Sequence, residues 1–397
     1  MARFRCRTAA STGIIALALV ASACSSGTTA ESADSAAAEA PASAAAPASS
    51  EAAEAPASAE AGAETSTEEV DYSALCGTEP LRVAHVAGFG ANSWRKITQG
   101  EIASELANCP NVTLEYTQAD GDLQKYITAI NSYVAQGYDA IVTYDDFGSQ
   151  ALGALQDATA AGVVVVPYIA DPGGVVGTDY AGYTEYDFNI EGDEMTRWLA
   201  EVTDPGAKLL AVGGLEGGSP STDALWQGIQ ETTAELGNHF TYLQDAPMAS
   251  SWDPAFEQKA MSGALTKYPE LDAYVSDYGN ATKGSLKAFI NAGRPIPPIA
   301  TSATDNELGC LWLEFKDTNP EFQLFTIDGT TTVVRTAARK ALAALNGVED
   351  TFPELVRLPV FVDTLNGKLP ECREDLPPDA DLSSNLTDEE LKAIFAQ

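Results

Sequence analysis

The fold of this chain is clearest in residues 127–142, Ile-Thr-Ala-Ile-Asn-Ser-Tyr-Val-Ala-Gln-Gly-Tyr-Asp-Ala-Ile-Val. The apolar spacing predicts an amphipathic helix over 122–136, and Gly137 ends it because glycine readily takes the left-handed conformation that follows many helices. The β-branched run 140–144 then predicts a strand. A helix that leads directly into a short apolar strand is typical of a parallel sheet covered by helices. The apolar stripe of the helix consists of Leu123, Ile127, Ile130 and Val134.

The same alternation of helix and strand continues on both sides of this unit and occurs in two consecutive sets. Two sets indicate an α/β protein with two doubly wound, parallel-sheet lobes. Thr387 and Glu390 form a capping box for a short final helix. The predicted strands cover 81–86, 112–116, 140–144, 163–166, 208–212, 240–244, 273–275, 298–301 and 322–327; the predicted helices cover 94–108, 122–136, 150–161, 191–201, 222–236, 254–267, 282–292 and 332–345.

The first 24 residues have the pattern of an export signal. Three arginines within residues 3–7 precede an apolar run over 14–23, and Cys24 follows the small residues Ala21-Ser22-Ala23. The run is too short to span a bilayer, which needs about 20 apolar residues. The cysteine resembles the lipobox of bacterial lipoproteins, so we expect residues 1–23 to be removed and Cys24 to carry a lipid. The alternative is an ordinary secretory signal with a cysteine there by chance.

Residues 24–70 form a tract of Ala, Ser, Pro, Glu, Gly and Thr, with hardly any other residue type. Such a composition cannot bury enough apolar surface to offset its ordering entropy, so we expect a disordered spacer. Its acidic residues repel one another and extend it. The spacer would hold a folded body away from the membrane, or it would serve only solubility.

The chain is strongly acidic, with a formal net charge of −35 at pH 7 and a pI of about 4.1. Such a charge repels nucleic-acid phosphates and offers no polybasic membrane contact. A solvated acidic surface that maintains solubility is the simpler explanation. We therefore expect no nucleic-acid partner.

Four cysteines remain once Cys6 leaves with the signal and Cys24 is lipid-modified: Cys76, Cys109, Cys310 and Cys372. An even number in an exported protein indicates disulfides, with three possible pairings. We favour 76–109 and 310–372, because the start of a strand and the end of the next helix lie at the same edge of a βαβ unit. No CxxC or Cys/His cluster indicates zinc, and we expect neither a metal nor a cofactor.

Aspartate and aromatic residues recur where the predicted strands end. Open α/β sheets bind ligands beyond the carboxyl ends of their strands. A turn-capping role is the alternative for any single aspartate, but recurrence at one edge of both lobes favours a ligand site. The candidates are Asn92, Ser93 and Trp94; Asp120; Asp145 and Asp146; Asp171; Trp252 and Asp253; Asp277 and Tyr278; Asp305 and Asn306; and Asp328.

The order of segments resembles the periplasmic sugar-binding proteins of ABC importers, in the ribose- and galactose-binding branch. Four motifs carry the resemblance, which covers roughly residues 81–362: 127–142, 160–166, 272–289 and 337–347. It implies two α/β lobes joined by a hinge of three crossovers, with the ligand in the cleft between them. It places the N-terminal lobe at 71–183 plus 329–352, and the C-terminal lobe and tail at 184–328 plus 353–397.

The resemblance also implies roles for single residues. Asn92 and Trp94 match a polar–aromatic pair that stacks on a sugar and bonds its hydroxyls, and Trp252 matches a stacking aromatic of the second lobe. Asp305 matches an aspartate that takes bidentate hydroxyl bonds. The ligand-binding set expected on this basis is Asn92, Trp94, Asp146, Asp171, Trp252, Asp277, Tyr278, Asp305 and Asp328.

Two departures from the ribose branch bear on the ligand. The segment 167–171 lacks the arginine expected after the fourth strand, and 219–228 offers Asp223 and Trp226 in place of another arginine. Arg95 and Lys96 restore part of that positive charge. We therefore expect a ligand other than ribose. A neutral sugar or polyol would donate hydroxyl protons to the aspartates, whereas a cation such as an amino sugar would use the aromatic faces, worth about 0.5–2 kcal/mol.

The resemblance implies a monomeric, non-enzymatic solute-binding protein. Its expected partners are a small-molecule ligand, the permease subunits of an ABC importer, and the membrane through the lipid anchor, on the outer face of the cell membrane. A sensor that reports the ligand to a membrane receptor would use the same clamp. A hydrolase is disfavoured because the sequence has no G-x-S-x-G, H-E-x-x-H or Walker motif.

Overall fold

The computed structural model describes residues 70–90 and 92–396. The predicted signal at 1–23, the lipidated Cys24 and nearly all of the predicted spacer lie outside these residues. No helix within the described part of the chain is long and apolar enough to cross a membrane. The described residues all belong to one structural unit, Gly62–Gln397.

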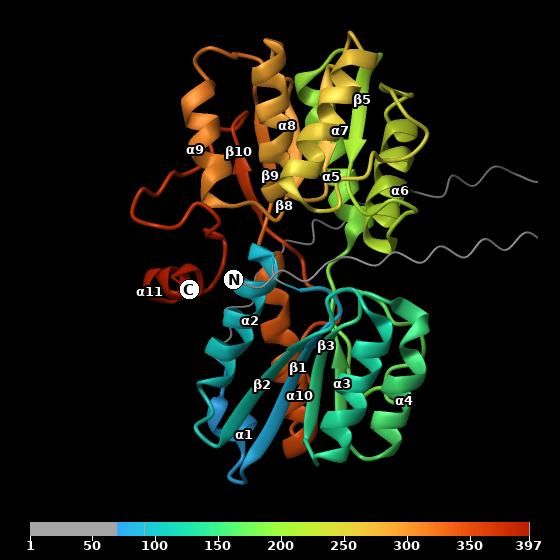
Figure 1. Ribbon diagram of the computed structural model, residues 1–397, viewed down its shortest axis with the longest axis vertical. Coiled ribbons are helices and arrows are strands. Elements are labelled where there is room, and N and C mark those ends of the chain that lie inside the picture. Colours follow the sequence, from blue (N-terminus) through green and yellow to red (C-terminus); the bar gives the residue numbers. More distant parts are fainter. Residues whose placement is uncertain (1–69, 91, 397) are drawn as a thin grey trace, which may run out of the picture. The chain divides into compact units, whose positions relative to one another are not determined.

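The first lobe is built on a four-stranded sheet with the order β2-β1-β3-β4, in which every pairing is parallel. Helix α10, which comes late in the chain, packs against β3, β4 and α2, so it completes this lobe (Figure 1). The elements are α1 (Tyr72–Cys76), β1 (Leu81–Ala87), α2 (Ser93–Leu106), β2 (Val112–Gln118), α3 (Leu123–Ala135), β3 (Ala140–Tyr144), η1 (Gly148–Gln150), α4 (Leu152–Ala160), β4 (Val164–Pro167), η2 (Thr330–Thr332) and α10 (Val333–Asn346).

The second lobe has a six-stranded sheet with the order β10-β9-β8-β7-β5-β6. Five strands are parallel, but β10 runs antiparallel to β9 and shows a register shift between Val360 and Val362. The elements are α5 (Phe188–Val202), β5 (Ala207–Val212), α6 (Pro220–Glu235), β6 (Phe240–Tyr242), α7 (Pro254–Lys267), β7 (Ala273–Ser276), α8 (Gly279–Ala292), β8 (Ile299–Ser302), α9 (Asn306–Phe315), β9 (Leu324–Ile327), β10 (Val360–Asp363) and α11 (Asp388–Phe395).

The antiparallel edge strand corrects the expectation of wholly parallel sheets. A parallel neighbour needs a crossover connection, usually a helix on the same sheet. The chain instead reaches β10 from α10, which packs on the sheet of the first lobe. It therefore enters the second sheet in the direction opposite to that of β9. The two-lobed α/β class holds with this change.

Three connections link the two sheets: β4 to α5, β9 to α10, and α10 to β10. They are hydrogen-bonded to one another. The Glu185 N–H donates to the Glu354 carbonyl at 2.7 Å, and the Val356 N–H donates back to the Glu185 carbonyl at 2.7 Å. The Asp328 N–H donates to the Pro359 carbonyl at 3.1 Å. The crossovers therefore form a short bonded ribbon rather than three independent linkers.

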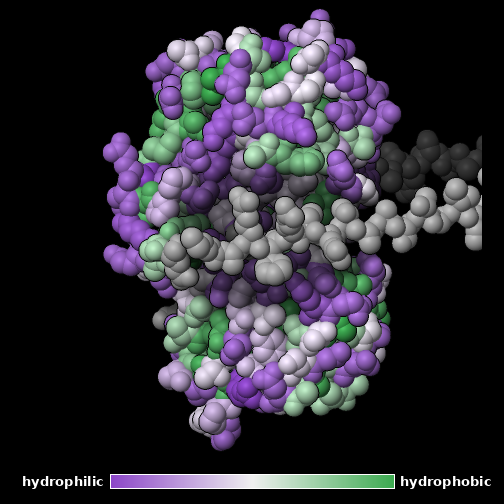
Figure 2. Space-filling model, viewed as in Figure 1, coloured by the Kyte–Doolittle hydropathy of each residue, from purple (hydrophilic) through white to green (hydrophobic). Residues whose placement is uncertain are grey.

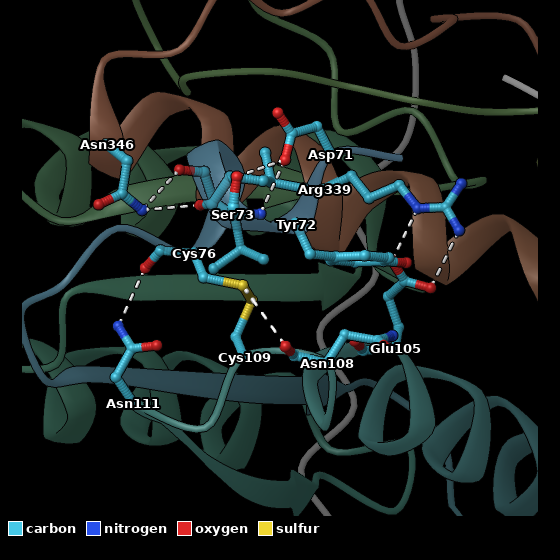
Figure 3. The surroundings of a disulfide bond; sticks show 12 residues. Asp71, Tyr72, Ser73, Cys76, Glu105, Asn108, Cys109, Asn111, Arg339 and Asn346 are labelled. Atoms are coloured by element: carbon cyan, nitrogen blue, oxygen red, sulfur yellow. Dashed lines mark hydrogen bonds and ion pairs between the residues drawn. A yellow bond between two sulfur atoms is a disulfide. The ribbon is translucent and has the colours of Figure 1, made fainter. Parts of the chain in front are cut away.

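Both favoured disulfides are present, Cys76–Cys109 and Cys310–Cys372. The first ties α1 to the turn after α2 (Figure 3). There the Asn111 side chain donates to the Cys76 carbonyl at 2.9 Å, and the Tyr72 hydroxyl donates to Glu105 at 2.6 Å. The start of the described chain is thus fixed firmly to the first lobe.

A buried ion cluster joins α2 to α10. Glu101 and Glu105 are fully buried on one face of α2, and Arg335 and Arg339 reach them from α10. Arg339 Nε lies 2.7 Å from Glu105 Oε1. Burying a carboxylate is costly unless it is paired and hydrogen-bonded, so the two arginines are needed for this packing.

Figure 2 shows that the visible outer face of both lobes is mostly hydrophilic, with small apolar patches.

Candidate ligand-binding site

A cavity of about 290 Å³ lies where the two lobes face each other. It is lined by the loops that follow β1 and β3 of the first lobe and the loops that follow β5, β6, β7 and β8 of the second. These are the carboxyl ends of the strands, where ligands of open α/β sheets bind. The lining includes Phe89, Asn92, Trp94, Arg95, Tyr144 and Asp146 from the first lobe, Tyr186 and Phe188 from the first crossover and the start of α5, and Leu215, Ser221, Ser251, Trp252, Asp253, Asp277, Tyr278 and Ala303 from the second.

Six of the nine predicted ligand residues line this cavity: Asn92, Trp94, Asp146, Trp252, Asp277 and Tyr278. Asn92 is also the N-cap of α2, and its side chain accepts from the Arg95 N–H at 2.9 Å. Trp94 is oriented by its indole N–H, which donates to the Thr330 hydroxyl at 2.8 Å. The cap fixes where α2 begins, and therefore where Trp94 and Arg95 project.

Arg95 and Asp146 form a buried ion pair in the first-lobe wall. Arg95 Nη2 lies 2.5 Å from Asp146 Oδ1, and both side chains are less than a tenth exposed. The Phe89 N–H donates to Asp146 Oδ2 at 2.9 Å. Burial raises the pKa of Asp146, and the neighbouring Arg95 opposes that rise. Arg95 Nη1 is buried and has no hydrogen-bond partner among the described residues.

The guanidinium of Arg95 lies on two aromatic faces. Its Cζ atom is 3.8 Å from the ring centroid of Tyr144 and 5.0 Å from that of Trp94. The two rings meet edge to face, with centroids 5.6 Å apart. Arg95 therefore supplies the cation for cation–π contacts with Tyr144 and Trp94, and these two ring faces are already occupied by a side chain of the protein.

Asp277 is the corresponding carboxylate of the second lobe. Its Oδ2 accepts from the Thr222 hydroxyl at 2.5 Å, the Gly214 N–H at 3.1 Å and the Trp252 indole N–H at 3.3 Å. Burial raises the pKa of Asp277 to about 6, and these donors oppose the rise. A Cβ on Gly213 would lie 2.4 Å from Asp277 Cγ, so only glycine leaves room for this carboxylate.

Two features of the second-lobe wall are energetically costly. Asp277 Oδ1 is buried and has no hydrogen-bond partner among the described residues. Trp252 has φ +49° and its neighbour Ser251 has φ +52°, which is the left-handed region that such residues rarely adopt. Backbone strain of this kind persists where the surroundings enforce it, and it concentrates at ligand clamps. The turn aims the Trp252 indole at Asp277.

The lobes touch beside the cavity. The Tyr278 hydroxyl lies 3.5 Å from the Ser93 hydroxyl, and the Asn280 side chain donates to the Ser93 hydroxyl at 3.1 Å. Burial raises the pKa of Tyr278 to about 12. Ser93 begins α2 in the first lobe, whereas the other two lie at the start of α8 in the second. A neutral phenol and an amide thus bridge the two walls.

The structure places the other three predicted residues away from the cavity. Asp171 is exposed and accepts from the Gly173 N–H at 2.7 Å, which is a turn role. Asp305 caps α9 and pairs with the buried Lys283 at 2.7 Å. Asp328 is fully buried and accepts from Thr304 through both oxygens, at 2.7 and 2.9 Å. Each carboxylate is satisfied within the protein.

Sequence reasoning missed several lining residues. Tyr144 ends one predicted strand and Phe89 lies three residues after another, so the same strand-end rule could have selected them. Arg95 stands out in the sequence for its charge, and its place one residue after Trp94 is a second signal that it lies at the cavity. Tyr186 and Phe188 come from the first crossover and the start of α5, where no local pattern marks them. Among the described residues, no group of three or more His, Cys, Asp or Glu side chains is placed to hold a metal ion.

Comparison with known proteins identifies the class. Residues 83–347 match the model of the periplasmic binding protein domain, and the chain belongs to that family. A curated relative, the xylitol-binding protein of Mycolicibacterium smegmatis, is 22% identical over 209 residues, which are 51% of this chain and 57% of that protein. The match thus spans little more than half of the relative.

Two solved structures show the same fold. A Mycobacterium smegmatis protein in complex with β-D-fucofuranose has a TM-score of 0.60 at 20% identity, over 72% of this chain and 93% of that one. The Caulobacter myo-inositol-binding protein, bound to myo-inositol, has a TM-score of 0.62 at 17% identity, over 73% and 95%.

Proposed function

We propose that this protein is an extracytoplasmic solute-binding protein that captures a small neutral polyhydroxylated ligand, a sugar or polyol, and delivers it to an ABC permease. The observation that carries the proposal is the inter-lobe cavity, whose opposite walls hold Arg95 and Asp277. The family and the ligands of the relatives, which are xylitol, fucofuranose and inositol, support the ligand class. Binding shifts the lobes toward a closed state because the ligand contacts both walls.

The charges of the cavity favour a neutral ligand over a cation. At the first-lobe wall a cation would meet the Arg95 guanidinium, which lies over Trp94 and Tyr144 and would repel it. An anion would meet Asp146 and Asp277. A polyol carries several hydroxyls, each of which can both donate and accept, so one ligand suits a cavity with the donor Arg95 on one wall and the acceptor Asp277 on the other.

Delivery to a permease at the membrane completes the proposal. The lipid on Cys24 would hold the protein on the outer face of the cell membrane, with residues 24–70 as a spacer. Tethering raises the effective concentration of the binding protein near its permease without any new contact. The protein acts as a monomer and catalyses no reaction.

Ligand binding can be tested directly on the purified protein. Xylitol, myo-inositol, arabinose and fucose form the neutral panel, with glucosamine as the cationic arm, and melting temperature and calorimetry report binding. We expect a neutral polyol to bind and Asp277→Asn to weaken it about 10- to 100-fold, the effect of losing a charged hydrogen bond worth about 1.5–3 kcal/mol. Asp171→Asn, an exposed carboxylate outside the cavity, is the matched control.

Two outcomes would overturn the proposal. Binding of glucosamine without any neutral polyol would show that the ligand class is wrong. Turnover of a glycoside by the purified protein would show that it is an enzyme rather than a carrier.

A further inference from the structure

The segment 364–396, which we call the C-terminal strap, is fixed to the second lobe at its beginning. Cys372 is bonded to Cys310 of α9. The Asn306 N–H, at the start of α9, donates to the Ala380 carbonyl at 2.8 Å. A Cβ on Gly309 would lie 2.1 Å from the Glu371 carbonyl oxygen, so the strap runs directly over the backbone of α9. This end is held both covalently and by close packing.

The other end of the strap lies on the first lobe. Helix α11 packs against α2, where Leu386 and Leu391 form a buried apolar cluster with Ile97. A Cβ on Gly100 would lie 2.7 Å from Ile394 Cδ1, so α2 has a gap shaped for this helix. The Asn385 N–H donates to the buried Glu101 at 2.7 Å. The strap therefore bridges the two lobes.

Between its ends the strap follows the hinge. The Asp379 carboxylate accepts from Lys283 and from Asn280, both at 3.1 Å, and Asn280 also donates to Ser93 of the other lobe. Asp381 accepts from the Thr331 hydroxyl at 2.7 Å, beside the second crossover. The strap thus contacts both the hinge and the point where the lobes touch.

We propose that the C-terminal strap restrains the opening of the two lobes and thereby slows ligand release. The proposal rests on the proposed function, because opening matters only if a ligand enters the cavity. Movement of α2 away from α9 must either pull α11 off α2 or stretch a segment that is disulfide-bonded to α9. The match to the family model ends at residue 347, so the strap lies outside the matched residues.

The test weakens the far end of the strap and leaves the cavity intact. Leu391→Ala removes most of a 3% exposed side chain from the cluster, whereas Lys392→Ala changes its exposed neighbour and is the matched control. Stopped-flow tryptophan fluorescence measures the dissociation rate of the polyol found to bind. We expect Leu391→Ala to raise that rate about 10-fold and Lys392→Ala to change it less than twofold. Cys310→Ser with Cys372→Ser, which frees the other end, should also raise it.

Hydrogen exchange of the ligand-free protein tests whether the strap restrains lobe opening even if no ligand is found. We expect Leu391→Ala to speed exchange at the start of α8 and in the third crossover, 347–359, as well as in α11. Faster exchange confined to α11, with an unchanged dissociation rate, would overturn the proposal. Absence of any ligand together with faster exchange at those lobe contacts would refute the proposed function and leave the strap in place.

Discussion

Replacement of Arg95 by methionine tests whether the buried pair with Asp146 holds the first-lobe wall together. The change keeps most of the side-chain volume and removes the charge. It leaves the Asp146 carboxylate buried without its charged partner, because Asp146 is 7% exposed, although the Phe89 N–H still donates to it. Removing one partner of a buried ion pair costs about 3–5 kcal/mol of unfolding free energy. We expect a loss of that size at pH 8.

The double variant Arg95→Met with Asp146→Asn distinguishes the free energy of the ion pair from the cost of leaving one buried charge without its partner. With both charges gone, no unpaired carboxylate remains, so the double variant should be more stable than Arg95→Met by about 2 kcal/mol or more. Urea unfolding at pH 8, without ligand, gives each free energy. Arg197→Met is the control, because its pairs with Asp193 and Glu235 are exposed and worth less than about 1 kcal/mol.

The pH dependence adds a second check on the same variant. Burial already raises the pKa of Asp146, and loss of Arg95 should raise it further. A carboxyl whose pKa is raised on folding stabilises the protein fully below its ordinary pKa and loses that stabilisation as pH rises through the folded value. Arg95→Met should therefore recover stability toward pH 5. Additive free energies in the double variant, with no recovery at low pH, would refute the reasoning.

The packing of α7 against α8 yields two further predictions. Burial raises the pKa of Glu257 to about 7, so its folded state binds an extra proton between about pH 4.5 and 7 and stability falls as pH rises through that window. Glu257→Gln keeps the oxygen that accepts from Tyr274 and should flatten this decline by about 2–3 kcal/mol between pH 5 and 8, measured by urea unfolding. Gly284→Ala should destabilise by more than about 1 kcal/mol, because its Cβ would lie 1.9 Å from the Pro254 carbonyl oxygen, whereas Gly263→Ala has open space and should be neutral or slightly stabilising. An equal melting temperature for these two glycine variants would contradict the packing argument.

Periodicity predicted most of the fold because most of its elements are regular. The helix expected at 122–136 is α3, and the strand expected at 140–144 is β3 with the same bounds. The capping box of Thr387 and Glu390 is also present in α11. Local pattern failed at β10, whose four residues carry no signal of direction. Its antiparallel pairing follows from the route of the chain through the other lobe, which is a long-range property.

The strand-end rule selected six residues that line the cavity, but it could not distinguish the aspartates that line the cavity from those that do not. Asp305 and Asp277 both follow a strand of the second lobe. The side chain of Asp305 turns back to accept from the Leu308 N–H, because a carboxylate is a preferred N-cap, while Asp277 points at Trp252. Which of these occurs depends on the donors nearby in space. Residue type and spacing alone do not contain that information.

The disulfide between Cys76 and Cys109 determines where mechanical tension would act. A pull at residue 70 passes through α1 to Cys76 and then, by a covalent bond, to the end of α2 in the same lobe. The Asn346 side chain, which donates to the Leu75 carbonyl at 2.9 Å, shares this load within that lobe. None of the three crossovers lies on the load path. Tension between residue 70 and a partner held on the first lobe would therefore bypass the hinge between the lobes.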